Sequence, residues 1–295
     1  MAEYVRLTSI TGYVAGPTNI GVIEDDRGQA VLIDTGIDAS TAKKAVKVLM
    51  GRGLKPVAVI STHSHADHIG GNACLAGMGV PVYAAALEAP FIENPLLESV
   101  CLMGGASPWP GLRHKFLLAP PSPVSGLLQP GTKFPGREME IINLSGHSLG
   151  QIGVLGGGVL FAGDSFLGEE VLQKHVIPYN VDIPAYLASL DRVRVCGAGF
   201  VVPGHGPALA DPAAALQFNR GTVLQQVEMV RELLGEGPLS VSALLQKLFV
   251  RLNMSVASDT FYLLYRTATL AYLSYLCHLG QVVVAMANNE PVFGR

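Results

Sequence analysis

The sequence contains few charged residues, a single tryptophan and only four cysteines. Charged side chains make up 15% of the 295 residues and the net charge is −3, so the chain has no long-range attraction for polyanions. We therefore do not expect a nucleic acid as partner. The cysteines show no C-x-x-C spacing, which argues against a disulfide framework or a zinc knuckle. Reduced thiols in a cytoplasmic protein are the expectation.

A long apolar run is also missing. The N-terminal residues MAEYVRLTSI include an acidic residue and no apolar core segment, so they do not predict a secretion signal. The most apolar stretch, residues 269–287, is interrupted by His278, Gly280 and Gln281, whereas crossing a bilayer takes about 20 apolar residues. We expect no membrane association. The low charge leaves a homodimer open.

Residues 1–62 instead alternate between strand and helix patterns. Apolar strands are predicted within residues 5–10, 19–25 and 30–36, and a helix follows Asp38, whose side chain suits an N-cap. A second apolar strand, PVAVIST, runs directly into His63. This β-α-β order predicts a layered α/β fold.

Residues 87–136 interrupt this pattern with prolines and glycines. An insertion of this size beside a site is often a lid or a contact surface, but it can equally be an irregular segment that covers the core. Strand patterns then resume at MEIINL, QIGVLGG, GVLFAGD and FVVPGHG.

Helical periodicity dominates after residue 210. Three helices are predicted, within residues 213–234, 241–252 and 260–279, followed by a β-hairpin that turns at Asn288 and Asn289. We therefore predict two domains, residues 1–210 and a helical winged-helix-like domain of residues 211–295. The second domain has six basic and six acidic residues, so it lacks the basic face of a nucleic-acid reader.

The segment THSHADHIGG, residues 62–71, is the strongest functional signal. In an extended chain, side chains two residues apart lie on one side, so His63 and His65 can bind the same ion. Asp67 and His68 follow where a turn redirects the chain and can face a second ion. Imidazole and carboxylate groups suit zinc, iron or manganese. The segment therefore predicts a metal site.

Three further residues at strand ends complete the candidate ligand set. His147 follows MEIINL, Asp164 follows GVLFAG, and His205 follows FVV, each between small residues that allow close approach to a metal. The remaining histidines (His114, His175 and His278) do not occupy such positions, and we expect structural or solvated roles for them.

In these motifs the chain resembles the metallo-β-lactamase superfamily, over about residues 4–210. The resemblance implies an αββα sandwich with two divalent metal ions at one edge of its sheets. It implies that the first ion is bound by His63, His65 and His147, that the second is bound by Asp67, His68 and His205, and that Asp164 bridges both. Asp34 would support the metal loop from behind the ligands.

Asp164 also bears on the substrate. True β-lactamases of this superfamily lack the bridging aspartate, so the chain looks closer to the glyoxalase II, lactonase and phosphodiesterase branches. We hypothesise that a hydroxide shared by two divalent ions, most simply zinc, attacks an ester, thioester, lactone or phosphoester of a small molecule. Asp67 would be catalytic by orienting this hydroxide, and Phe166, His175 and Tyr179 are candidate substrate contacts.

Three alternatives stay open. The C-terminal helices resemble those of a superfamily subgroup with members that cut single-stranded RNA, which leaves a metal-dependent ribonuclease possible. A non-heme iron dioxygenase acting on thiols or persulfides uses similar ligands. A metal-binding regulator without catalysis is the third.

Overall fold

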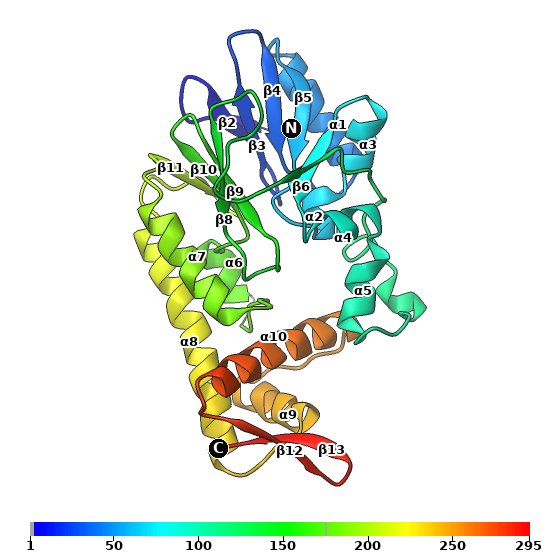
Figure 1. Ribbon diagram of the computed structural model, residues 1–295, viewed down its shortest axis with the longest axis vertical. Helices are drawn as coiled ribbons and strands as arrows, with labels where there is room; N and C mark the ends of the chain where they lie inside the picture. The colour runs from blue at the N-terminus through cyan, green and yellow to red at the C-terminus, as the bar shows by residue number, and fades with distance from the viewer. Residues whose placement is uncertain (1–2, 175) are drawn as a thin grey trace.

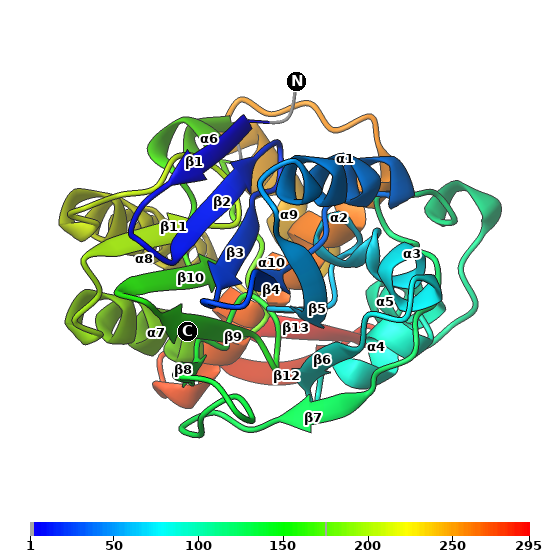
Figure 2. The ribbon, with the colours of Figure 1, turned by 90° about the horizontal axis from the view of Figure 1, so that it is seen from above.

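The computed structural model describes residues 3–174 and 176–295, and two stacked β-sheets form its centre (Figures 1 and 2). The larger sheet has the strand order β1-β2-β3-β4-β5-β6-β7, and the smaller one β11-β10-β9-β8. The larger sheet consists of β1 (Glu3–Arg6), β2 (Thr11–Ala15), β3 (Ile20–Glu24), β4 (Gln29–Ile33), β5 (Lys55–Ile60), β6 (Val82–Ala85) and β7 (Gly126–Leu128). The smaller one consists of β8 (Met139–Asn143), β9 (Ile152–Gly156), β10 (Val159–Gly163) and β11 (Phe200–Pro203).

Apolar side chains alternate between the two faces of the larger sheet. Ile23 and Ile33 belong to the core between the sheets, whereas Val22 and Leu32 belong to a separate core on the outer face. Because successive side chains of a strand point to opposite faces, these nearly continuous apolar runs place buried side chains on both faces of the sheet. Helix α1 (Ala39–Met50) covers the outer face, and Asp38 caps it by accepting a hydrogen bond from the Thr41 amide, as predicted.

Helices also cover the outer face of the smaller sheet. Leu144, Leu160 and Val201, from this sheet and the loop after β8, share one apolar core with residues of α7 (Ile183–Val195) and α8 (Ala213–Gly235). The order of layers is therefore helix, sheet, sheet, helix. The predicted αββα sandwich is confirmed.

The insertion of residues 87–136 is more regular than its proline and glycine content predicts. It contains α4 (Ala89–Glu93), α5 (Leu96–Leu102) and the short 3-10 helix η1 (Pro110–Leu112), and it ends in β7, the edge strand of the larger sheet. Ile92, Leu102 and Leu112 are buried, so each short helix is held by tertiary packing.

The C-terminal region follows the predicted order of three helices and a hairpin. After α8 come α9 (Val241–Arg251), α10 (Asp259–His278), β12 (Val283–Ala287) and β13 (Glu290–Gly294). Helix α10 extends from α8 across to α5 (Figure 1). There the Trp109 indole N–H donates a 2.6 Å hydrogen bond to Asp259, and Leu112 and Leu263 share an apolar cluster. Among the described residues, no helix is both long and apolar enough to cross a membrane.

Candidate metal centre

The segment of residues 62–68 begins just after β5 and changes direction at His65. His65 has extended backbone angles and precedes α2 (Ala66–Ile69), so the chain passes from an extended residue at His65 into a helix that contains Asp67 and His68. This change is the turn that the sequence predicts. It lets one short segment contribute to two neighbouring groups of side chains.

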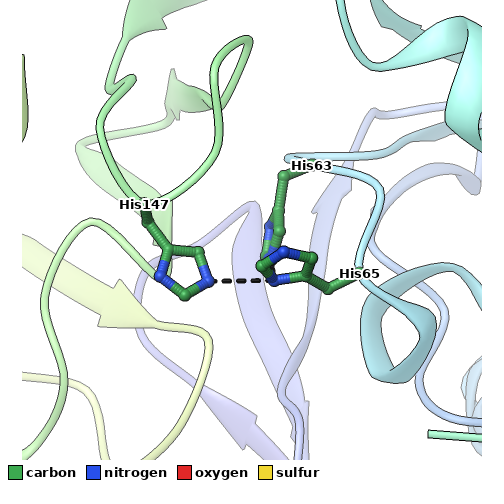
Figure 3. A group of neighbouring side chains, drawn as sticks. All are labelled: His63, His65 and His147. Atoms are coloured by element: carbon green, nitrogen blue, oxygen red, sulfur yellow. Dashed lines mark hydrogen bonds between the residues drawn. The ribbon is translucent and has the colours of Figure 1, made fainter. Parts of the chain in front are cut away.

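The first group consists of three histidines whose ring nitrogens point toward one another (Figure 3). His65 Nδ1 lies 3.1 Å from His63 Nε2 and 2.9 Å from His147 Nε2. Two nitrogens bound to one tetrahedral zinc ion at about 2.05 Å lie about 3.3 Å apart. The spacing of the three nitrogens therefore fits one bound ion.

The second group consists of Asp67, His68 and His205. His205 Nε2 lies 3.2 Å from Asp67 Oδ2, and His68 Nε2 lies 3.8 Å from the same oxygen. Asp164 lies between the groups: its carboxylate oxygens are 3.4 Å from His68 Nε2, 3.3 Å from His205 Nε2 and 3.7 Å from His147 Nε2. All seven predicted ligands therefore come together.

The polar atoms at the centre fit a cation better than they fit each other. His68 Nε2 and Asp164 Oδ1 are buried, and neither makes a hydrogen bond within the part of the chain that the structure describes. Buried polar atoms are rarely left without a partner, so such a pair needs an explanation. The backbone of Gly204 packs directly against Asp164, because a Cβ atom at Gly204 would lie 2.0 Å from Asp164 Oδ1.

Asp34 lies directly behind the metal loop. Its carboxylate accepts hydrogen bonds from the Thr62 amide and hydroxyl, both at 2.8 Å, and from His68 Nδ1 at 2.8 Å. A carboxylate only accepts, so Nδ1 of His68 carries a proton, and in the neutral form of the ring the lone pair of Nε2 faces the centre. Asp34 itself has a φ of 63°, a left-handed conformation that non-glycine residues adopt mainly where the surrounding structure enforces it.

Carbonyl groups orient two other histidines in the same way. Nδ1 of His147 donates to the carbonyl of Tyr179 at 2.9 Å, and Nδ1 of His205 donates to the carbonyl of Pro17 at 2.5 Å. In their neutral forms both rings therefore aim a lone pair at the centre.

The two groups differ in their electrostatics. Burial lowers the pKa of His63 and His65, and it lowers that of His147 to about 4, so these rings are neutral at pH 7. Asp164 raises the pKa of His205 to about 10. Burial opposes the charge on His68, but Asp164 and other nearby carboxylates raise its pKa well above the usual value. Without a cation, the second group therefore holds protons.

Glu88 is an important residue that the sequence analysis missed. Its buried carboxylate accepts hydrogen bonds from the amide and hydroxyl of Ser64, at 2.9 and 2.6 Å, and from the Ser148 hydroxyl and the Gly150 amide, both at 2.7 Å. Ser64 lies between two candidate ligands and Ser148 follows a third. Glu88 therefore joins the two loops that form the three-histidine group. Its only sequence signal is a lone acid in the apolar segment AAALEAP.

A cavity of about 360 Å³ opens beside the centre, and five of the seven candidate ligands line it. Tyr179 also lines it, as a substrate contact would. Phe166, in contrast, is fully buried in the core and is not among the lining residues. Its ring has no surface toward the cavity, so we assign it to packing. His175 lies outside the described residues.

Glu98 is a second residue that sequence reasoning missed. It lies on α5 in the insertion and lines the cavity, with Oε1 3.9 Å from His65 Nε2. Burial, helped by the charge of Glu88, raises the pKa of Glu98 to about 7.

Comparison with known families identifies the fold family. The family model of the metallo-beta-lactamase superfamily matches residues 13–205, a range that includes every candidate ligand. The chain belongs to this superfamily. It is therefore a metallo-hydrolase, and the resemblance inferred from the motifs is confirmed.

Relatives within the metallo-beta-lactamase superfamily include thioesterases. A hydroxyacylglutathione hydrolase of Xanthomonas campestris pv. campestris (strain B100) is 28% identical over 217 residues, which cover 73% of this chain and 70% of the relative. An acyl-coenzyme A thioesterase of Gallus gallus is 28% identical over 167 residues, or 52% of this chain and 58% of the relative. The crystal structure of a metallo-beta-lactamase family protein from Thermus thermophilus has a TM-score of 0.73 at 22% identity, and covers 100% of this chain and 98% of that one. The fold thus extends over the C-terminal region.

Proposed function

We propose that the protein hydrolyses a thioester or ester of a small molecule with two divalent metal ions, most simply zinc. His63, His65 and His147 would bind one ion, and Asp67, His68 and His205 the other. The observation that carries this proposal is the position of Asp164, whose carboxylate lies within 3.7 Å of histidines from both groups. A carboxylate in that position suits a bridge between two ions.

Ions in such a site supply Lewis acidity, which activates a water molecule and polarises the carbonyl group of the substrate. The protein's own residues do the positioning. Asp67 accepts a 3.1 Å hydrogen bond from the Thr18 hydroxyl, which fixes the direction of its carboxylate. Its side chain is 34% exposed and lines the cavity, so its carboxylate can accept a hydrogen bond from a water molecule and orient that water toward a bound substrate.

Two observations favour a thioester or ester over the other substrates considered. Two relatives are named as enzymes that cleave thioesters. By its motif, Asp164 would occupy the position that β-lactamases of the superfamily leave without an aspartate, which argues against a β-lactam. The seven ligands would use more carboxylates than a single non-heme iron requires, so we propose hydrolysis and not oxygen chemistry.

Thioester turnover measures this function directly. We expect zinc-loaded protein to release thiol from S-acetyl-N-acetylcysteamine, and we expect activity to disappear after chelation and to return with zinc. Asp67→Asn should lower kcat by about 10²-fold or more. His278→Ala removes an exposed histidine outside the candidate ligand set and should change neither metal content nor kcat. Full activity in chelated protein, or in Asp67→Asn, contradicts the proposal.

The division into domains remains part of the proposal. We propose that residues 1–210 form the catalytic unit and that residues 211–295 form a winged-helix-like addition to it, in a cytoplasmic protein. Because Leu160 of β10 and Tyr272 of α10 belong to one apolar core, the two units should unfold in a single transition. Two separate transitions in thermal unfolding would refute this coupling.

A further inference from the structure

We propose that the cavity beside the candidate metal centre binds an apolar, uncharged chain carried by the thioester or ester substrate. This inference rests on the hydrolytic function proposed above and narrows its substrate class. It follows from the composition of the cavity wall, from the charges that face it, and from the elements that build it.

Beyond the candidate ligands the wall of the cavity is mostly apolar, and its polar members are Glu98, Tyr179 and Tyr265. Beyond the candidate ligands, apolar residues come from three segments that are far apart in the sequence: Leu117 of the insertion, Leu167 and Ile177 that follow the bridging aspartate, and Leu264 of α10. Leu117 and Ile177 are 7% and 2% exposed, so they form its inner part. A carbonyl group at the metal centre would extend its remaining chain along these side chains. Burial of apolar surface would then contribute to binding.

The charges in the cavity disfavour an anionic chain. Among the described lining residues there is no lysine or arginine, and the acid outside the candidate ligand set is Glu98. A carboxylate or phosphate group bound along the wall, away from the metal centre, would lose its hydration without gaining a lysine or arginine partner there. The wall therefore selects against the charged end of a substrate.

The C-terminal region closes this cavity. Phe116 of the insertion and Phe261 of α10 line it while remaining 67% and 46% exposed, which puts both aromatic rings at its rim. The Trp109–Asp259 hydrogen bond and a 3.1 Å contact between His114 and Thr260 join the insertion to α10 beside this rim. The insertion and the C-terminal helices thus act together as the wall of one binding site.

A series of thioesters tests this inference. We would measure kcat/KM for N-acetylcysteamine thioesters with acetyl, butanoyl, pentanoyl, hexanoyl, octanoyl and glutaryl groups, and for S-alkyl thioacetates in which the apolar chain is on the sulfur side. In one of the two series kcat/KM should rise about fourfold for each methylene group until the cavity is filled. The series that responds identifies the side of the substrate that enters. If the acyl side of the substrate enters the cavity, kcat/KM for the glutaryl thioester should be at least tenfold lower than for its pentanoyl analogue.

Leu264→Ala should reduce the ratio of kcat/KM for the preferred long-chain thioester to kcat/KM for the acetyl thioester at least threefold. Val250→Ala, at an 82% exposed position of α9, is the matched control and should leave the profile intact. A flat profile in both series overturns the inference while leaving the hydrolytic function in place.

Direct binding separates this inference from the proposed function. If neither thioesters nor esters are cleaved, the hydrolytic proposal fails, but the cavity can still be tested with neutral amides in zinc-loaded protein by calorimetry. Octanamide should bind at least tenfold more tightly than acetamide. Equal affinity for the two amides overturns the inference independently of catalysis. The same holds if wild type and Leu264→Ala bind octanamide with equal, weak affinity.

Discussion

The substitution Glu88→Gln should loosen the three-histidine group without touching any candidate ligand. Glu88 is 2% exposed and accepts four hydrogen bonds, one from a backbone amide and one from a hydroxyl group on each carboxylate oxygen. A glutamine side chain keeps only one of these oxygens. Its NH₂ group must face either the Ser64 amide or the Gly150 amide, which then loses its acceptor, whereas a serine hydroxyl group can rotate to accept.

An unpaired buried amide costs about 1–3 kcal/mol, and the remaining bonds lose the assistance of the charge. We therefore expect the free energy of unfolding of metal-free Glu88→Gln, measured in urea, to fall by about 2–4 kcal/mol. Zinc affinity at the three-histidine group, measured by competition with a chromogenic chelator, should fall about 10- to 100-fold, as for other residues that orient ligands.

Glu93→Gln is the matched control because Glu93 ends α4, the short helix that Glu88 precedes; it is exposed and accepts one 3.3 Å hydrogen bond from the Val124 amide. It should change the free energy of unfolding by less than about 0.5 kcal/mol. If Glu88→Gln is as stable as this control and binds zinc as tightly as wild type, the inferred role of Glu88 is refuted.

Three further predictions concern the second group of ligands. Zinc binding at pH 7.5 should release about two protons, one each from His68 and His205, because their raised pKa values keep both rings protonated in the metal-free protein. Calorimetry in buffers of different ionisation enthalpy counts the released protons. A value near zero refutes the electrostatic argument. Asp34→Asn should lower the zinc affinity of one site about 10- to 100-fold and leave that of the other unchanged. Competition with a chelator resolves the two sites as two unequal affinities. Gly204→Ala should lose metal while retaining its far-UV circular dichroism, because the added methyl group would lie 2.0 Å from the candidate bridging carboxylate; full metal content in this variant would contradict the described packing.

The sequence predicts the candidate ligands well because their signals are local. His63, His65, Asp67 and His68 fall within six residues, and the other three each directly follow an apolar strand. Strong apolar patterns likewise predict α1, the strands β9 and β10, and the C-terminal helices. Such features depend on neighbouring residues, which a single sequence displays.

Features that depend on distant contacts are not predictable in this way. Glu88 gains its role from Ser64 and Ser148, which are 24 and 60 residues away. The strand β7 has only three residues and is held by pairing with β6. Phe166 follows the candidate bridging aspartate as a substrate contact would, yet its ring packs into the core. The contribution of α10 to the cavity also appears only when the whole chain is folded.

Metal stoichiometry tests the central claim most directly. Elemental analysis of zinc-saturated protein after gel filtration should give two zinc ions per chain for wild type and for the control His278→Ala, and fewer than two for Asp164→Ala. If the wild type holds one ion or none, or if Asp164→Ala retains both, the two groups of ligands do not form a bridged pair and the proposed function loses its basis.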